Sequence, residues 1–131
     1  MSDHELELAY GLRYFTADEI NAVSFGCVDG FNKIQSIAII KLDEVRHRLG
    51  YPLTLTCAYR TREHDISKGR SGNSDHCLGT GFDIQINGLV HALQIVAESA
   101  KEGFNSFGIN LKAGFVHIGI KPKTKITTWE Y

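Results

Sequence analysis

The chain has 131 residues, of which 43% are hydrophobic, and its formal net charge is −1. A chain of this length and apolar content fits a single domain over residues 1–131 that buries a core without disulfides. Mixed charges without a basic face argue against a nucleic-acid partner. The absence of a long apolar run and of a secretory signal argues against membrane insertion and signal-directed export.

The first half of the chain carries two helix signals. Residues 1–11 are polar with scattered leucines, and we expect a loose or edge segment there. Thr16, followed three residues later by Glu19, matches a capping box, which predicts the start of a short helix. Apolar residues then recur at steps of three and four over residues 31–49, which predicts a long helix that Gly50 ends.

The second half alternates strands with one more helix. β-Forming residues alternate over 53–59 and predict a strand. Residues 60–73 are charged and show no periodicity, so we expect a long loop that forms one wall of a substrate cleft. The remaining elements are a strand over 82–86, a helix over 89–100 and a hairpin of strands over 104–109 and 115–120. Helices packed on one side of a small, mainly antiparallel sheet make an α+β fold.

The segment from Ser74 to Asp83 reads S-x-H-x-x-G-x-G-x-D and contains candidate metal ligands. Successive side chains on a strand point to opposite faces, so Asp83 lies on the face away from its apolar neighbours, and the same holds for His117. If the two strands are neighbours, Asp83 and His117 share one polar face and His76 reaches in from the preceding loop. Two histidines and one carboxylate form a ligand set of catalytic zinc, which keeps its fourth position for water. We therefore predict one zinc ion held by these three residues.

The three cysteines are Cys27, Cys57 and Cys77, an odd number at wide spacing without a C-x-x-C pair. We expect buried, reduced thiols in a chain that folds in the cytoplasm, rather than a disulfide. Cys77 adjoins His76 and is the one thiol that we single out as a neighbour of the metal.

These motifs resemble the signature of zinc peptidases related to D-Ala-D-Ala carboxypeptidases and L-alanyl-D-glutamate endopeptidases, whose fold is shared with the Hedgehog signalling domain. Tyr59-Arg60-Thr61, Phe115-Val116-His117 and Trp129 occur in the order that this family has. The resemblance spans roughly residues 12–131. It implies a Hedgehog/DD-peptidase-like fold and a zinc-dependent peptidase that hydrolyses peptidoglycan stem peptides through a metal-activated water.

Residues near the motif are candidates for binding substrate. The planar guanidinium of Arg60 suits a carboxylate or a developing oxyanion, and the resemblance implies a substrate-binding or transition-state role for it. We expect Tyr59 and Ser74 to contact substrate as well. Ser74 is also a candidate outer partner that fixes the ring of His76. We expect Trp129 and Tyr131 to pack the C-terminal tail.

The acid that many members of this family carry near the last histidine is missing. Gly114 stands three residues before His117 and Gly119 stands two residues after it, where such members have a carboxylate. A general acid or base contributes about 10²–10⁴-fold in rate, so catalysis needs a substitute. Asp75 is our candidate, although it would point away from the ligands in an extended segment. The other candidates are Glu63, Asp65 and Glu130.

Three functions remain open from the sequence. The first is a monomeric zinc peptidase with peptidoglycan peptide as its partner, acting on the cell wall after release or as part of a phage particle, as a phage or prophage lysis enzyme would. The second is a non-catalytic zinc-containing module of the same fold that binds cell wall or peptide, for which the missing acid argues. The third is a metal-free structural domain of a larger assembly such as a virion.

Overall fold

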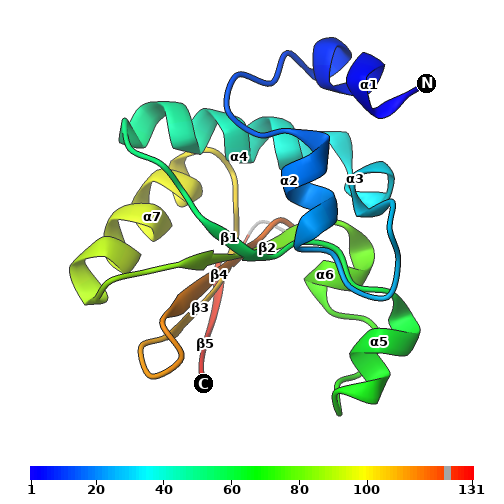
Figure 1. Ribbon diagram of the computed structural model, residues 1–131. Coiled ribbons are helices and arrows are strands. Elements are labelled where there is room, and N and C mark those ends of the chain that lie inside the picture. The colour runs from blue at the N-terminus through cyan, green and yellow to red at the C-terminus, as the bar shows by residue number, and fades with distance from the viewer. Residues whose placement is uncertain (123–124) are drawn as a thin grey trace.

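The computed structural model of the protein describes residues 1–122 and 125–131. The elements in chain order are α1 (Asp3–Tyr10), α2 (Ala17–Ala22), α3 (Gly30–Lys33), α4 (Ser36–Leu49), β1 (Leu55–Cys57), α5 (Arg62–Ser67), α6 (Asp75–Leu78), β2 (Gly81–Gln85), α7 (Leu89–Lys101), β3 (Ser106–Asn110), β4 (Phe115–Gly119) and β5 (Thr127–Glu130) (Figure 1). Within the described residues, the strands form one five-stranded sheet in the order β1-β2-β4-β3-β5. Neighbouring strands are antiparallel except β3 and β5, which are parallel. The predicted α+β class is confirmed.

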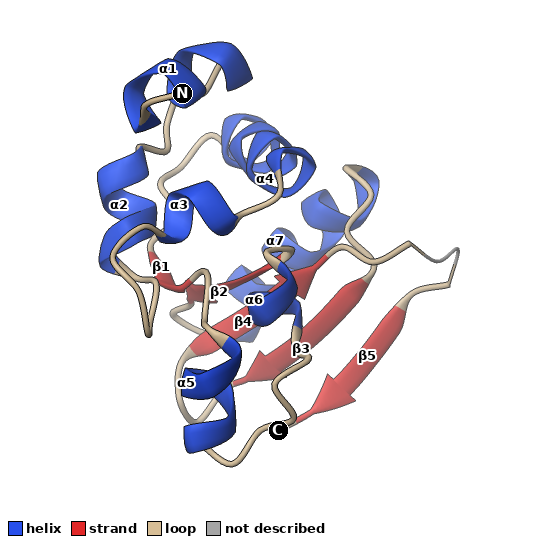
Figure 2. Ribbon diagram, turned by 90° about the vertical axis from the view of Figure 1, so that its right-hand side faces the viewer, coloured by secondary structure: helices blue, strands red, loops and turns tan. Residues whose placement is uncertain are grey.

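The hydrophobic core lies between this sheet and the helices α2, α4 and α7 (Figures 1 and 2). The strands contribute alternate residues to it, among them Phe82, Ile84, Val116 and Ile118, all with no exposed surface. Because side chains alternate along a strand, the residues between them point to the other face of the sheet. That second face, beside the short helices α5 and α6, carries the predicted site. In the described part of the chain, no helix is both long and apolar enough to cross a membrane.

The long helix predicted over residues 31–49 is divided into α3 and α4. Gln35 is extended at the junction, with φ −69° and ψ 135°, and its N–H donates to the carbonyl of Gly79 at 2.9 Å. This bond ties the helix start to the turn that precedes β2. Gly50 ends α4 in the left-handed conformation, as predicted.

The N-terminal segment, expected to be loose or to lie at an edge, forms an ordered helix at the edge. Residues 3–10 form α1 rather than a loose segment, because the side chains of Ser2 and Glu5 each bond the other's backbone N–H in a capping box. No residue from Asp3 to Tyr10 is buried, so the helix lies at the edge of the domain.

The segment predicted as a cleft loop, residues 60–73, contains the helix α5. Thr61 caps it by accepting a hydrogen bond from the backbone N–H of His64 at 3.2 Å. Asp65 is completely buried on this helix and accepts a hydrogen bond from the N–H of Gly72 at 2.9 Å, which folds the rest of the segment back. A buried carboxylate, rather than an apolar stripe, therefore holds this segment in place, and hydrophobic periodicity gives no sign of it.

Candidate metal centre

One row of residues crosses the sheet on the face away from the core. In register order its members are Cys57 on β1, Asp83 on β2, His117 on β4, Gly108 on β3 and Trp129 on β5. A Cβ at Gly108 would overlap the indole of Trp129, so the missing side chain lets that ring lie across β3. The indole thereby comes within 5.1 Å of the His117 ring, between centroids.

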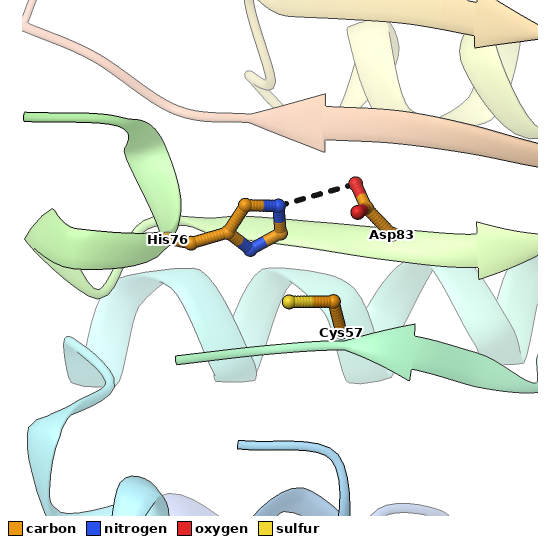
Figure 3. A group of neighbouring side chains, drawn as sticks. All are labelled: Cys57, His76 and Asp83. Atoms are coloured by element: carbon orange, nitrogen blue, oxygen red, sulfur yellow. Dashed lines mark ion pairs between the residues drawn. The ribbon is translucent and has the colours of Figure 1, made fainter. Parts of the chain in front are cut away.

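His76 enters the site from α6, a single helical turn in front of β2. Gly79 ends this turn with φ 73°, and a Cβ there would overlap the carbonyl oxygen of Lys33. The tight reversal brings His76 Nε2 to 3.2 Å from Asp83 Oδ1 (Figure 3). His117 Nδ1 lies 2.8 Å from the same oxygen. The structure thus brings together all three residues predicted as metal ligands, each of them buried.

Both histidine rings are held from behind by hydrogen bonds. His76 Nδ1 lies 2.6 Å from the carbonyl oxygen of Ala58, which can only accept, so this nitrogen donates. His117 Nε2 lies 2.8 Å from Asp75 Oδ2. Histidines that ligate metals ordinarily donate their second N–H to a carbonyl or a carboxylate in this way. The remaining nitrogens and the Asp83 carboxylate are donors of the types that zinc binds, and the two nitrogens lie 3.2 and 2.8 Å from one carboxylate oxygen.

The sequence suggests Ser74 as the outer partner that fixes the ring of His76, but the structure gives this role to another residue. The hydroxyl of Ser74 donates to Asp65 Oδ1 at 3.2 Å, and the carbonyl of Ala58 takes the predicted role. A carbonyl partner leaves no signal in the side-chain sequence.

In the metal-free protein, the charges of this cluster balance one another. Burial opposes the charged form of His76, but the Asp83 carboxylate and the neighbouring Cys57 sulfur outweigh it and raise the pKa of the imidazole to about 10. Burial likewise opposes ionisation of Asp83, yet the two histidines hold the pKa of that carboxyl well below its usual range. A proton on His76 therefore supplies the positive charge that a bound cation would replace.

Asp75 also belongs to the site, because its segment is helical rather than extended. Its side chain is buried. Oδ2 lies 2.8 Å from His117 Nε2, and Oδ1 lies 3.2 Å from Lys121 Nζ. Burial opposes ionisation, but His117 and Lys121 outweigh it and lower the pKa of the carboxyl. A Cβ at Gly81 or Gly119 would overlap the side chain of Asp75, so both glycines leave room for it.

Arg60 reaches the centre from the segment after β1 and is 8% exposed. Its Nη1 lies 3.1 Å from Asp65 Oδ1, and its Nη2 lies 4.0 Å from Asp83 Oδ2. The Nε is buried and has no hydrogen-bond partner among the described residues. Asp65, which the sequence offered as a replacement acid, is instead the buried anion that positions this guanidinium.

A cavity of about 260 Å³ opens over the centre. The residues that line it are Arg60, Arg70, Ser74, Asp75, His76, Asp83, Ser106, His117, Lys121, Thr127, Trp129 and Tyr131. Among the described residues, Tyr59, Glu63 and Glu130 do not line it. Tyr59 is instead partly buried against the hydrophobic core, and its backbone N–H donates to the hydroxyl of Ser24 at 3.3 Å.

The thiol near the metal ligands is not the expected one. Cys77 turns its sulfur toward the carbonyl of Thr61, at 3.8 Å, and the hydroxyl of Ser74, at 3.5 Å. Cys57 instead forms a group with His76 and Asp83 whose ligand atoms all lie within 4.8 Å of one another (Figure 3).

Comparison with known proteins gives one result that bears on this site. A family model described as Peptidase M15 matches residues 13–119, which include His76, Asp83, His117 and Arg60. No curated protein matches the chain. The matched range ends before Lys121 and the strand β5.

Proposed function

The chain belongs to the peptidase M15 family, whose members are zinc peptidases of the D-Ala-D-Ala carboxypeptidase type; from that premise we propose that it hydrolyses peptide bonds in the stem peptides of peptidoglycan. The bond that it cuts is either D-Ala-D-Ala or L-Ala-D-Glu. The observation that carries this proposal is the convergence of His76, Asp83 and His117, whose free ring nitrogens face one carboxylate oxygen at 3.2 and 2.8 Å.

We assign the metal ligands to these three residues. When bound, zinc supplies a Lewis acid for the peptide carbonyl and lowers the pKa of water toward neutrality. Ala58 and Asp75 keep the two imidazoles facing inward, so little reorganisation is needed when the ion arrives. The mixed nitrogen and oxygen donor set with an outer shell in place supports a preformed site.

Arg60 is the proposed anchor for the substrate. Its guanidinium is fixed by Asp65 on one side, the residue lines the cavity, and its buried Nε has no hydrogen-bond partner among the described residues. Arg70 and Lys121 line the same cavity, so its rim is positively charged on two further sides. Such a rim suits peptides that carry carboxylates, as a donor fork binds a carboxylate or oxyanion with good geometry.

Asp75 is the proposed acid/base group. Asp75 and Asp83 are the carboxyl groups that line the cavity among the described residues, and Asp83 serves as a ligand. Asp75 is therefore the group left to accept a proton, and its bond to His117 Nε2 places it against the centre. The lowered pKa keeps the carboxylate ionised at neutral pH, and the same lowering makes it a weaker base than an ordinary carboxylate.

A second function, a zinc-containing module that binds peptide without turnover, is favoured by one observation. Gly114 and Gly119 replace the acid near His117, and Asp75 is already engaged by His117 and Lys121. Product formation separates the two functions.

The test combines metal analysis with digestion of purified muropeptides followed by mass spectrometry. We expect about one zinc per chain and one defined cleavage product in the wild type, and neither in H76A. Zinc with peptide binding but no product would favour the binding module, and absence of stoichiometric metal would overturn both functions.

A further inference from the structure

We propose that the thiolate of Cys57 is a fourth protein ligand of the metal centre, beside His76, Asp83 and His117. This inference rests on the proposed function, because it assumes that the three residues hold the ion. It goes further because it assigns a protein ligand to the fourth coordination position, which an open catalytic site leaves to water.

A β-bulge places the thiol there. Leu55 pairs with Ile84, which faces the core, and two residues later Cys57 pairs with Asp83, which faces the site. In a regular strand, residues two apart share a face, so Cys57 would have followed Leu55 into the core. The irregularity between Leu55 and Cys57 inserts one extra residue and turns Cys57 to the other face. Bulges beside active sites commonly re-aim a side chain in this way.

The sulfur lies close enough to serve as a donor. The ligand atoms of Cys57, His76 and Asp83 all lie within 4.8 Å of one another, and the His76–Asp83 pair is already at 3.2 Å (Figure 3). Zinc bond lengths of about 2.0–2.3 Å put the donor atoms of a tetrahedral site roughly 3.3–3.7 Å apart. Small side-chain movements therefore suffice to bring the sulfur to an ion held by His76 and Asp83. His117 stands outside this group of described residues, although its Nδ1 lies 2.8 Å from Asp83 Oδ1.

Cys57 is surrounded by polar and charged side chains, whereas a cysteine that only fills space in a core is surrounded by apolar ones. A buried free cysteine ordinarily behaves as a small hydrophobe. Cys57 is buried, at 7% exposed, yet among the described residues it stands outside the contiguous hydrophobic cluster to which Leu55 and Ala58 belong. Its hydrogen bond to the carbonyl of Ala58 is long, at 4.0 Å, and its sulfur also interacts with the side chains of His76 and Arg60. The thiol thus lies beside metal-ligand side chains, with the Arg60 guanidinium as a further charged neighbour.

A thiolate in this position changes the character of the centre. Two imidazoles and one carboxylate leave the fourth tetrahedral position open, whereas an added sulfur gives the closed set of a structural site. Zinc is bound by the thiolate form of cysteine, so binding would require the thiol to lose its proton. With Cys57 bound, the centre would lack the position for water that the proposed hydrolysis needs, so hydrolysis would require Cys57 to be displaced.

Cobalt substitution tests the assignment through a readout independent of turnover. We expect the cobalt-loaded wild type to show an intense thiolate-to-metal charge-transfer band in the near ultraviolet, in addition to weak visible bands. C57S should lose the charge-transfer band and keep the visible bands. C77S, the matched control, should keep both, because Cys77 bonds Thr61 and Ser74 instead. We expect C57S to bind zinc at least about tenfold more weakly than C77S.

A measurement on the unaltered chain covers the case in which C57S fails to fold. X-ray absorption at the zinc edge of the wild-type protein should show one sulfur among nitrogen and oxygen neighbours. A shell of nitrogen and oxygen alone, or equal cobalt spectra for wild type and C57S, would overturn the Cys57 assignment and leave the proposed function standing. Failure of the wild type to bind either metal would overturn both.

Discussion

The carboxylate of Asp75 occupies the space that a side chain at position 119 would need, because a Cβ on Gly119 would overlap Asp75 Oδ2. The same oxygen lies 2.8 Å from His117 Nε2. Gly119 and Asp75 lie 44 positions apart in sequence. The carboxylate of Asp75 fits where it does because Gly119 has no side chain.

The substitution G119A is expected to push Asp75 away from His117. Crowding a packed site costs about 1–3 kcal/mol of stability, and loss of the outer carboxylate should weaken zinc binding about 10–100-fold. Zinc affinity measured by competition with a chelating dye, together with urea unfolding, checks both effects. In a D75A background the overlap with the carboxylate is gone and only His117 Nε2, at 3.2 Å, stays close to the added methyl group, so G119A should then cost clearly less. Additive effects of the two substitutions would contradict the contact.

The substitutions D75N and D75A separate the two tasks that we give to Asp75. The amide oxygen of D75N can still accept the hydrogen bond from His117 Nε2 but cannot take a proton. We expect D75N to keep zinc affinity within a few-fold of the wild type and to lose about 10²–10⁴-fold in kcat, the worth of a general acid or base. D75A should lose zinc affinity as well. A D75N enzyme with normal kcat in a muropeptide assay would remove Asp75 as the proton acceptor and leave it a positioning role.

The sequence was enough to predict which face of the sheet carries the site, because the alternation of side chains along a strand does not depend on distant contacts. Asp83 and His117 each stand between two core residues, so their common face followed once β2 and β4 were taken as neighbours. His76 followed from the short glycine-containing turn that precedes β2. These features are local, and local patterns determine them.

Features that depend on tertiary contacts were not predictable in the same way. The bulge in β1 moves Cys57 to the face opposite the one that alternation gives it. The helical turn of α6 brings Asp75 inward although an extended segment would point it away. The strand β5 lies at the edge of the sheet and all its residues are exposed. No alternation of buried and exposed residues was therefore available to predict it. The helix α1 is different, because its capping box at Ser2 and Glu5 was present in the sequence.

In the metal-free protein, the His76–Asp83 pair is expected to make its largest contribution to folding stability between roughly pH 4 and 6.5. The raised pKa of His76 gives a contribution that is complete below the unfolded value and is lost as pH rises through about 10. The lowered pKa of Asp83 gives a contribution that is present above its unfolded value and is lost as pH falls below it. Urea unfolding in the presence of a chelator, as a function of pH, measures this window. In H76Q the decline above about pH 6.5 should be smaller, and an unchanged decline would show that other groups cause it.

Trp129 is expected to report binding at the metal centre through its fluorescence. It is the one tryptophan in the sequence, and its ring lies 5.1 Å from that of His117 across Gly108. An ion with a partly filled d shell quenches a nearby indole, so titration with cobalt should remove the larger part of the emission and saturate near one equivalent. D83A, which removes the carboxylate shared by both histidines, should require far more cobalt for the same quenching. G108A provides a control for geometry, because its added methyl group displaces the indole while the ligands stay in place. Saturable quenching that is equal in wild type and D83A would place the bound cobalt elsewhere on the protein.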